Sequence, residues 1–301
     1  NSDDLRFFQM IATHPSLAAT ARAMNVTPPT ITQRLQIIEQ KLKLKLVDRH
    51  ARNITLTNEG ILLAARAAII LEEMDDLHES IYSQRNEVAG CLKVLAPLGF
   101  GREYIAPLIT KYQQQYESLS VELELSDNPD WASKHSWDII IYIGELRDSS
   151  LKLSTLAQNK RFLCAAPSYI SKHGLPKEPA DLRQHHCIAL RENAEDVTMW
   201  KFTHAEGNKS ESIRIKPKLS CNDGRVIKQW ALDGYGIIAR SEWDVAAELE
   251  NGTLVRLLTD YELPTANIVA LLGTDQRSRS RRTTKFLALL KKEIGTKSWN
   301  L

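Results

Sequence analysis

The sequence predicts an α/β protein that carries an all-α winged helix-turn-helix head, and three observations point to this fold class. Residues 16–57 have the caps and apolar spacing of a helix-turn-helix followed by a basic hairpin. Residues 58–85 contain no proline and one glycine, Gly60, so one long helix is expected there. From Gly90 onward, short β-rich runs are separated by helical stretches or loops, as in an α/β sheet.

A tight turn joins the two helices of the predicted head. Ser16 can cap the first helix, because its hydroxyl can accept from a free N–H group of the first turn. Asn25 suits the turn, since asparagine tolerates a left-handed backbone, and Val26 is expected to fill the space between the helices. Thr27 is the expected N-cap of the second helix, with Pro28 at the first helical position, where its missing N–H costs nothing.

The second helix should run to about Leu42 and present its outer face to solvent. Its buried stripe has spacings of four, three and four residues and consists of Ile31, Leu35, Ile38 and Leu42. Polar groups near the helix start can hydrogen-bond base edges or phosphates, and proline rings can contact thymine methyl groups. The candidate DNA-reading residues are therefore Thr27, Pro28, Pro29, Thr30, Thr32, Gln33 and Arg34.

A small wing is predicted after this helix. From Arg49 to Leu56, polar and apolar residues alternate as in a hairpin along a phosphate backbone, with Arg49 and Arg52 as the candidate contacts. Residues 20–56 hold seven basic and two acidic residues, a local net charge of +5, whereas the whole chain carries only +2. Such a concentration of charge favours nucleic acid as the partner of the head. The alternative is a three-helix cap whose polar residues are simply solvated.

Several short motifs between Leu5 and Gly60 belong together. They are Leu5-x-x-Phe8, Ser16 to Ala21, Thr27 to Thr32, Leu35-x-x-Ile38-Glu39-x-x-Leu42, Arg49 and Leu56-Thr57-x-x-Gly60. With these motifs the stretch resembles the LysR-type transcriptional regulators, which implies that the second helix enters the major groove of promoter DNA and that the wing grips the flanking backbone. Lys43 departs from the family pattern by replacing a glycine, at a cost of about 1 kcal/mol in a left-handed conformation. Val47 also departs from it, since it replaces a phenylalanine.

The long helix carries a heptad seam. Its members alternate at spacings of four and three residues and are Leu63, Ala67, Ile70, Met74, Leu77 and Ile81. A second copy of the helix would cover this seam in a coiled coil, so a homodimer is predicted, whose two heads could read two half-sites. The alternative is an amphipathic helix packed on its own chain, and a homotetramer is the other assembly that the sequence leaves open.

The composition is that of an ordinary soluble globular protein, with 43% hydrophobic and 25% charged residues. No apolar run reaches the roughly 20 residues of a membrane span, and Asn1 to Asp4 do not begin a signal sequence, so a cytoplasmic location is expected. The four cysteines lack C-x-x-C spacing and are Cys91, Cys164, Cys187 and Cys221. Buried free thiols are expected rather than disulfides or zinc ligands, with a redox sensor as the alternative.

The remainder of the chain is expected to form two lobes. The predicted strands are 92–96, 121–125, 138–143, 161–165, 187–190, 213–215, 218–221, 236–238 and 268–272, with a helix from about 102 to 116. Further motifs are Pro97 to Arg102, Ile105 to Pro107, Ser126-Asp127, Ile143-Gly144, Ala165 to Tyr169 and Gly234 to Gly236. They resemble the effector-binding half of the LysR-type regulators, which is similar to periplasmic solute-binding proteins of type II.

The expected domains follow from this division. They are a DNA-binding head (1–57), a linker helix for dimerisation (58–88) and an effector-binding domain (89–301). Within the last, one lobe would comprise about 90–162 and 268–301, and the other about 163–267.

A ligand cleft is expected where strands end and helices begin. Pro97 ends the first strand, and Asn222-Asp223-Gly224 begins a later helix, so unpaired N–H groups would face the strand ends and favour a small anion. The candidate effector-binding residues are Leu98, Gly99, Phe100, Gly101, Asp127, Asn222 and Asp223. The predicted effector is a small organic acid. The two aspartates would repel a carboxylate and could instead hold an amine, a hydroxyl or a cation, or they could merely cap helices.

No constellation for catalysis, a cofactor or a metal is recognised. His185 and His186 would point to opposite faces of a strand and so chelate one ion poorly. Gly99-Phe-Gly101 is too short for a dinucleotide fingerprint, because Tyr104 occupies the third glycine position. The basic run Arg277, Arg279, Arg281 and Arg282 is expected to be solvated before a last helix, Thr283 to Ile294.

These features predict a bacterial, sequence-specific transcription regulator that is not an enzyme and whose DNA affinity or DNA bending responds to a small molecule. Its expected partners are double-stranded promoter DNA, the effector and a second copy of the chain, with RNA polymerase as a further candidate. The main alternative is a small-molecule binding protein without a role on DNA. An enzyme would need a nucleophile or an acid-base pair with perturbed pKa values in the cleft.

Overall fold

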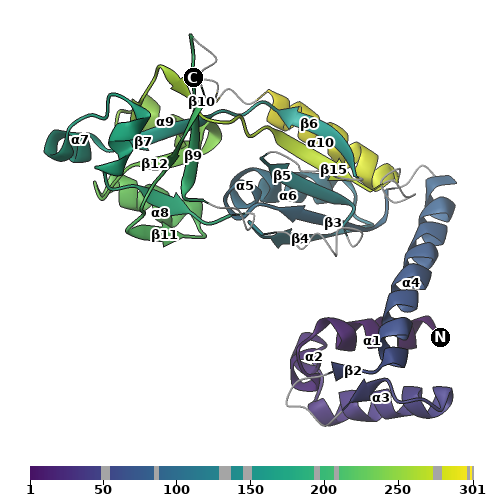
Figure 1. Ribbon diagram of the computed structural model, residues 1–301. Helices are drawn as coiled ribbons and strands as arrows, with labels where there is room; N and C mark the ends of the chain where they lie inside the picture. The colour runs from purple at the N-terminus through teal and green to yellow at the C-terminus, as the bar shows by residue number, and fades with distance from the viewer. Residues whose placement is uncertain are drawn as a thin grey trace. The chain divides into compact units, whose positions relative to one another are not determined.

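The computed structural model describes residues 1–48, 55–84, 88–128, 137–144, 151–192, 197–206, 210–273, 280–296 and 299 (Figure 1). The chain divides into two compact units, Asn1–Glu87 and Val88–Leu301, and each has its own hydrophobic core. None of the described helices combines the length and the apolar character that a membrane crossing requires.

The first unit is a winged helix-turn-helix followed by a long helix, which confirms the predicted fold class. It consists of α1 (Ser2–Thr13), α2 (Leu17–Ala23), α3 (Pro28–Leu42), β1 (Val47–Asp48), β2 (Thr55–Leu56) and α4 (Asn58–Gln84). β1 and β2 pair in the antiparallel sense, as the two sides of the wing. The core contains Phe7, Phe8, Ile11, Ala21, Ile31, Leu35, Ile38, Leu46 and Val47.

Local chemistry sets the boundaries of α2 and α3 as predicted. The Ser16 hydroxyl accepts a hydrogen bond from Ala19 N at 3.1 Å, which caps α2. Asn25 has a φ of 59°, the left-handed conformation that the tight turn requires. Lys43 ends α3 with a φ of 56°, in the place where glycine would be free of strain.

Two residues expected in the interior of the head lie on its surface instead. The side chains of Val26 and Leu42 are 40% and 46% exposed. The prediction was wrong because it omitted α1, which completes the core with Phe7, Phe8 and Ile11. Those aromatic and branched side chains supply the apolar volume that the turn had been expected to provide.

Glu39 fixes the turn that leads from α3 to the wing. Its carboxylate is buried and accepts hydrogen bonds from Leu46 N at 2.9 Å and Lys45 Nζ at 3.0 Å. Burial acts to raise the pKa of Glu39, but these bonds hold the pKa below its usual value, so the side chain stays charged. The turn also needs Gly60, because a side chain there would collide with the carbonyl of Leu46.

The seam of α4 is divided between two surroundings. Leu63 and Ala67, its first two members, pack against α1 and the core of the same unit. This part of the seam fits the alternative prediction, a helix packed on its own chain. Ile70, Leu77 and Ile81 are 45%, 60% and 52% exposed. These later members of the seam are therefore free to meet a second copy of the helix.

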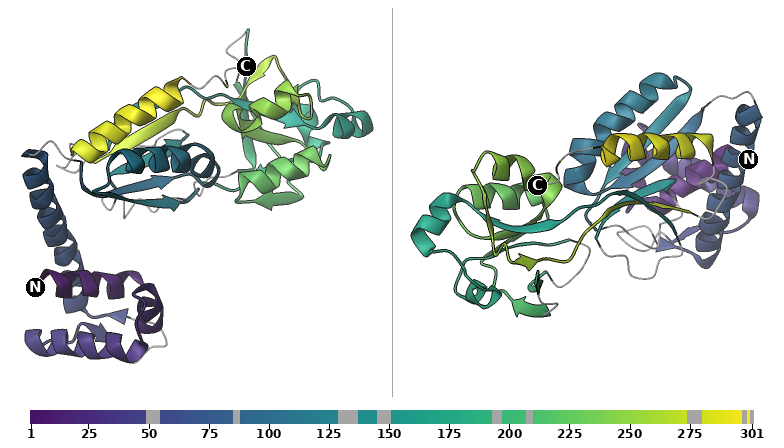
Figure 2. Two further views of the ribbon diagram at one scale, coloured as in Figure 1. Left: turned by 180° about the vertical axis from the view of Figure 1, so that it is seen from behind. Right: turned by 90° about the horizontal axis from the view of Figure 1, so that it is seen from above.

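The second unit contains two groups of elements, here named lobe I and lobe II (Figure 2). Lobe I comprises β3 (Gly90–Ala96), α5 (Leu98–Phe100), a π-helical turn (Gly101–Ile105), α6 (Ala106–Gln115), β4 (Leu119–Leu125), β5 (Ile139–Ile143), β6 (Lys152–Ala157), β15 (Ile268–Leu272) and α10 (Arg281–Gly295). Its sheet has the order β4-β3-β5-β15-β6. β3 is parallel to β4 and β5, whereas β15 is antiparallel to β5 and β6, so the carboxyl ends of β3, β4 and β5 share one edge.

The start of α10 corrects the prediction of a solvated basic run. Arg282 is 4% exposed, and its Nη2 lies 3.7 Å from a carboxylate oxygen of Asp138, which is itself buried. The Tyr112 hydroxyl donates to the carbonyl oxygen of Arg282 at 2.8 Å and ties α6 to α10. Arg282 therefore anchors α10 to lobe I, while Arg277 and Arg279 lie outside the described residues.

Lobe II is built from smaller sheets. It comprises β7 (Arg161–Ala165), α7 (Pro167–His173), a 3-10 turn (Pro179–Arg183), β8 (Ile188–Leu190), β9 (Met199–His204), β10 (Ser210–Arg214), β11 (Leu219–Cys221), α8 (Gly224–Leu232), β12 (Ile238–Ser241), α9 (Glu242–Glu250), β13 (Val255–Leu257) and β14 (Tyr261–Glu262). The strand orders are β12-β7-β13, β10-β9-β14 and β11-β8. The elements that were not predicted are β6, α7, β9, β13, β14 and α9.

The chain crosses between the lobes twice, and a buried asparagine joins the two crossings. Asn159 precedes β7, and its Nδ2 donates to the carbonyl oxygen of Ala266 at 2.8 Å on the returning segment. The same nitrogen donates to the Ser241 hydroxyl at 3.2 Å, where β12 ends. Asn159 is only 1% exposed, so these bonds are shielded from water and hold the crossings together.

Candidate functional site

The start of α3 presents a row of polar and proline side chains. Thr27, Pro28, Pro29, Thr30 and Gln33 are exposed, and Thr32 is half-buried. The hydroxyls of Thr27 and Thr30 are 2.9 Å apart, and the Thr32 hydroxyl donates to the carbonyl oxygen of Pro28 at 3.1 Å. The candidate DNA-reading residues at the helix start are thus largely accessible, as a groove-reading helix requires.

Arg34 points to α1 rather than away from the head. Its Nη2 donates to the carbonyl oxygen of Asp3 at 3.0 Å and lies 4.0 Å from the Asp4 carboxylate. The guanidinium also stacks over the Phe7 ring at 4.6 Å. Arg34 therefore holds α3 against α1, a contact that periodicity within α3 could not indicate. Arg49 and Arg52 lie outside the described residues.

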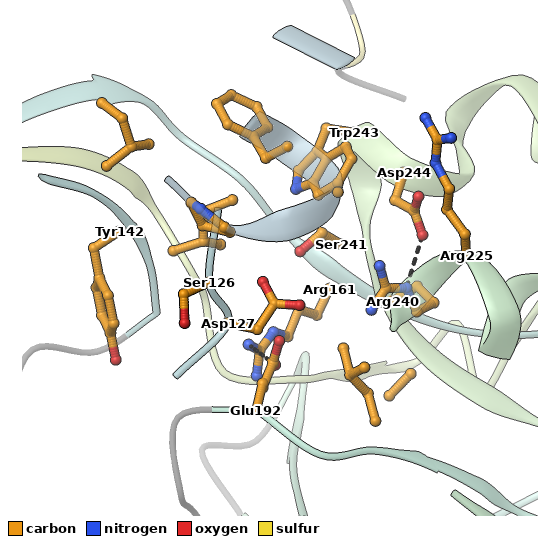
Figure 3. Close-up of a pocket in the computed structure, with 18 of the residues that line it drawn as sticks. Ser126, Asp127, Tyr142, Arg161, Glu192, Arg225, Arg240, Ser241, Trp243 and Asp244 are labelled. Atoms are coloured by element: carbon orange, nitrogen blue, oxygen red, sulfur yellow. Dashed lines mark hydrogen bonds and ion pairs between the residues drawn. The ribbon is translucent and has the colours of Figure 1, made fainter. Parts of the chain in front are cut away.

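A cavity in the second unit is lined by residues of both lobes (Figure 3). From lobe I come Pro97, Gly99, Phe100, Ser126 and Asp127, which follow the carboxyl ends of β3 and β4. Lobe II contributes Leu190, Glu192, Gly224 and Arg225, which lie at or just beyond the ends of β8 and β11. Strand ends of open α/β sheets are where ligands bind, so this cavity is the candidate effector site.

Charged side chains of both signs line the cavity. Among the described residues, the lining contains three arginines and three acids, namely Arg161, Arg225, Arg240, Asp127, Glu192 and Asp244. The volume of about 50 Å³ leaves room for several ordered waters or for a small ligand.

The carboxylates of the cavity already have protein partners. Asp127 Oδ1 accepts from Leu98 N at 2.8 Å, and Glu192 accepts from Arg161 Nη2 at 3.0 Å. Asp244 accepts from Arg240 Nε at 2.7 Å. Burial raises the pKa of Asp127, and the negative charge of Glu192 adds to the rise, while the bond from Leu98 opposes it.

Arg240 is a buried cation with unused donors. It is 7% exposed and uses Nε for Asp244, and its two terminal nitrogens have no hydrogen-bond partner among the described residues. Burial acts to lower the pKa of Arg240, but Asp244, Glu192 and Asp127 hold the pKa above its usual value. A side chain at Gly224 would overlap the guanidinium, so this glycine makes the space that Arg240 occupies at the cavity wall.

The sequence-based candidates for effector binding divide into two groups. Gly99, Phe100 and Asp127 line the cavity, and the remaining candidates, Leu98, Gly101, Asn222 and Asp223, are not among its lining residues. Asp223 caps α8 through a bond from Arg225 N at 2.8 Å, and the N–H group of Leu98 is taken by Asp127. A side chain at Gly101 would meet Leu125 and Ala96, so Gly101 faces the interior of lobe I.

Sequence reasoning missed Arg161, Glu192, Arg240 and Trp243. These residues come from β7, the segment after β8, the end of β12 and the start of α9. They share no local motif, because they are distant in sequence and the folding of lobe II, including the pairing of β7 with β12, brings them together. The feature that marks three of them in the sequence is a charged residue next to a short apolar strand.

Histidine, cysteine and acidic side chains bear on the metal and redox alternatives. No group of three or more His, Cys, Asp or Glu side chains there could hold a metal ion. Burial raises the pKa of Cys164 and of Cys187 to about 12, which suppresses their thiolates. Cys91 and Cys221 are only half-buried, so the expectation of burial was wrong for these two.

Family models match nearly the whole chain. Residues 2–61 match the bacterial regulatory helix-turn-helix protein of the lysR family, and residues 85–295 match the LysR substrate binding domain. The chain belongs to the LysR family of transcriptional regulators. It is therefore a DNA-binding regulator of LysR type with an effector-binding domain, as the motifs predicted.

Proteins with similar sequences and solved structures with a similar fold agree with the assignment to the LysR family. The transcriptional regulator DmlR of Escherichia coli K12 is 32% identical over 95% of this chain and 92% of its own length. The transcriptional activator TtdR of Escherichia coli UTI89 is 34% identical over 89% of this chain and 86% of its own. The full-length virulence activator AphB of Vibrio cholerae is 25% identical, with a TM-score of 0.69 over 98% of this chain and 99% of that one.

Proposed function

We propose that a small organic acid is the effector of this LysR-type regulator, and that it binds in the cavity between the lobes and alters the affinity or bending of promoter DNA. The proposal is carried by the state of Arg240, a buried guanidinium at the cavity wall. Its two terminal nitrogens face the cavity and have no hydrogen-bond partner among the described residues. Two parallel N–H donors match the two oxygens of a carboxylate, which makes this the natural ligand of such a group.

The balance of donors and acceptors favours an acid over an amine. Each cavity carboxylate, Asp127, Glu192 and Asp244, already accepts a hydrogen bond from the protein. The two terminal nitrogens of Arg240 remain available as hydrogen-bond donors. A ligand that supplies acceptors therefore completes the site, whereas an amine would leave the terminal nitrogens of Arg240 unpaired.

On the DNA side, we propose that the exposed start of α3 reads the major groove. The residues assigned to this role are Thr27, Pro28, Pro29, Thr30, Thr32 and Gln33, with Arg49 and Arg52 on the flanking phosphates. Arg34 also belongs to this set, because its side chain is 39% exposed while it holds α3 on α1. Two chains would pair through α4 and could assemble further into a tetramer, and RNA polymerase is the partner that such a regulator would meet at a promoter.

The test uses the full-length chain, a panel of small organic acids and amines, and a duplex selected by the chain from a random pool. At least one acid should raise the melting temperature and change the mobility of the complex with DNA. Arg240→Lys keeps the charge but loses the paired donors, and it should weaken acid binding about tenfold.

Arg256→Lys is the matched control, because Arg256 stacks on Phe162 in the same lobe and does not line the cavity. This variant should bind the acid as the unchanged chain does. A response to amines alone, or an Arg240→Lys variant with full acid affinity, would contradict the proposal.

A further inference from the structure

The turn from β12 into α9 supplies a second, neutral set of donors to the same cavity. Trp243 is 7% exposed and lines the cavity, and its buried Nε1 has no hydrogen-bond partner in the described structure. Figure 3 shows the indole nitrogen on the edge of the ring that faces Ser241 and Asp127. An unpaired N–H group in a buried position is costly, and a ligand acceptor would remove that cost.

The direction of this N–H group is fixed by the packing of the indole ring. The ring of Phe100 lies edge-on to it with centroids 5.2 Å apart, and the ring of Tyr104 lies edge-on at 5.8 Å. Gly99 faces the ring so closely that a Cβ there would be 3.2 Å from Trp243 Cη2. Because these neighbours hold the ring, the donor is oriented before a ligand arrives.

Ser241 provides another donor beside Trp243. It is 8% exposed, and its oxygen accepts from Asn159 Nδ2 at 3.2 Å. Among the described residues, no acceptor for the Ser241 hydroxyl proton is found, and the side chain makes no cap hydrogen bond to α9. The hydroxyl can therefore donate to a ligand while it keeps its bond to Asn159.

We propose that Trp243 and Ser241 form a second polar subsite, which binds an oxygen of the effector other than the carboxylate held by Arg240. The inference rests on the proposed function and extends it from organic acids in general to acids that carry a further hydroxyl, carbonyl or carboxyl oxygen. Arg240 and Ser241 end β12, Trp243 begins α9, and all three line the cavity, so one small molecule can contact them together. A plain aliphatic acid leaves the indole N–H unpaired and binds less well.

The discriminating experiment compares acids of matched size by calorimetry on the full-length chain. Lactate and pyruvate are compared with propionate, and succinate is compared with butyrate. Trp243→Phe removes the N–H group. A second variant carries at position 243 a tryptophan analogue in which sulfur replaces the N–H, which preserves the ring and its packing. Trp230→Phe is the control, because Trp230 packs in lobe II and does not line the cavity.

In the unchanged chain, at least one acid with a further oxygen should bind about tenfold more tightly than its plain counterpart. Both variants at position 243 should reduce this ratio to about twofold, and Trp230→Phe should keep it. The subsite would be refuted if the two kinds of acid bound the unchanged chain equally well, or if the affinity ratio stayed the same in both variants. Neither result would contradict acid binding through Arg240. If none of the five acids bound at all, the organic-acid effector itself would fall.

Discussion

Asp127 holds the start of α5 through a hydrogen bond and has a raised pKa. Its carboxylate accepts from Leu98 N and so fixes the start of α5, and burial together with Glu192 raises its pKa. Arg240 opposes this rise, and the charge of Asp223 adds to it. A bound carboxylate would bring one more negative charge to the same place and raise the pKa of Asp127 further.

Acid binding should therefore weaken as the pH rises through the raised pKa of Asp127. Below that pKa the carboxyl group is already protonated, whereas above it binding requires the uptake of a proton. Asp127→Asn keeps the acceptor for Leu98 N, so calorimetry at pH values where the ligand carboxylate stays ionised should show a flat profile and about tenfold tighter binding at neutral pH.

The exposed Asp260→Asn serves as a control for this pH series, since Asp260 lies away from the cavity lining. Its profile should match that of the unchanged chain. A pH dependence that persists in Asp127→Asn would contradict the assignment of the titration to Asp127.

At the scale of elements, the two ends of α3 differ in their surroundings. The start carries exposed polar side chains, whereas the end is bound into the turn through Glu39 and Lys43. Gln33 and Gln40 are both exposed and lie seven residues apart, so they share one face of the helix two turns from each other. They form a matched pair for the test of which end reads DNA.

Gln33→Ala should reduce the preference for the selected duplex over a random one by about 1–3 kcal/mol, because an amide that reads a base edge is lost. Mobility-shift titrations at several salt concentrations should give an unchanged salt dependence, since no phosphate contact is removed. Gln40→Ala should keep the preference. Equal losses in both variants would mean that reading is not confined to the helix start.

At the scale of the whole molecule, the exposed apolar side chains of α4 are the candidate contact between two chains. Leu77 is 60% exposed on α4, and Leu175 in lobe II is 58% exposed. The two leucines are thus equally accessible but lie on different surfaces. Replacing each by glutamate adds the same charge to the surface, so a difference between the two variants reports on the role of α4.

Leu77→Glu should raise the dimer dissociation constant about a hundredfold, because two leucine side chains would lose their burial at a symmetric interface. Sedimentation equilibrium on the full-length chain measures the change, and Leu175→Glu should leave the dissociation constant as it was. If Leu77→Glu retained the mass of the unchanged assembly, dimerisation through the C-terminal half of α4 would be refuted.

The sequence by itself determined the parts of this protein that depend on neighbouring residues. The cap at Ser16, the left-handed turn at Asn25 and the bounds of α3 follow from local backbone chemistry, which near neighbours control. Apolar spacing likewise indicated strands such as β7 and β15. Family motifs then indicated the winged helix-turn-helix and the effector-binding domain.

Only the tertiary structure decided which side chains meet. Arg34 contacts α1 across the head, which its place in α3 did not indicate, and Arg282, expected to be solvated, is a buried partner of Asp138. The cavity likewise joins Asp127 to Arg240, which lie more than a hundred residues apart in the chain. Contacts at such separation depend on how whole sheets pack and cross, and no local pattern of residues records that arrangement.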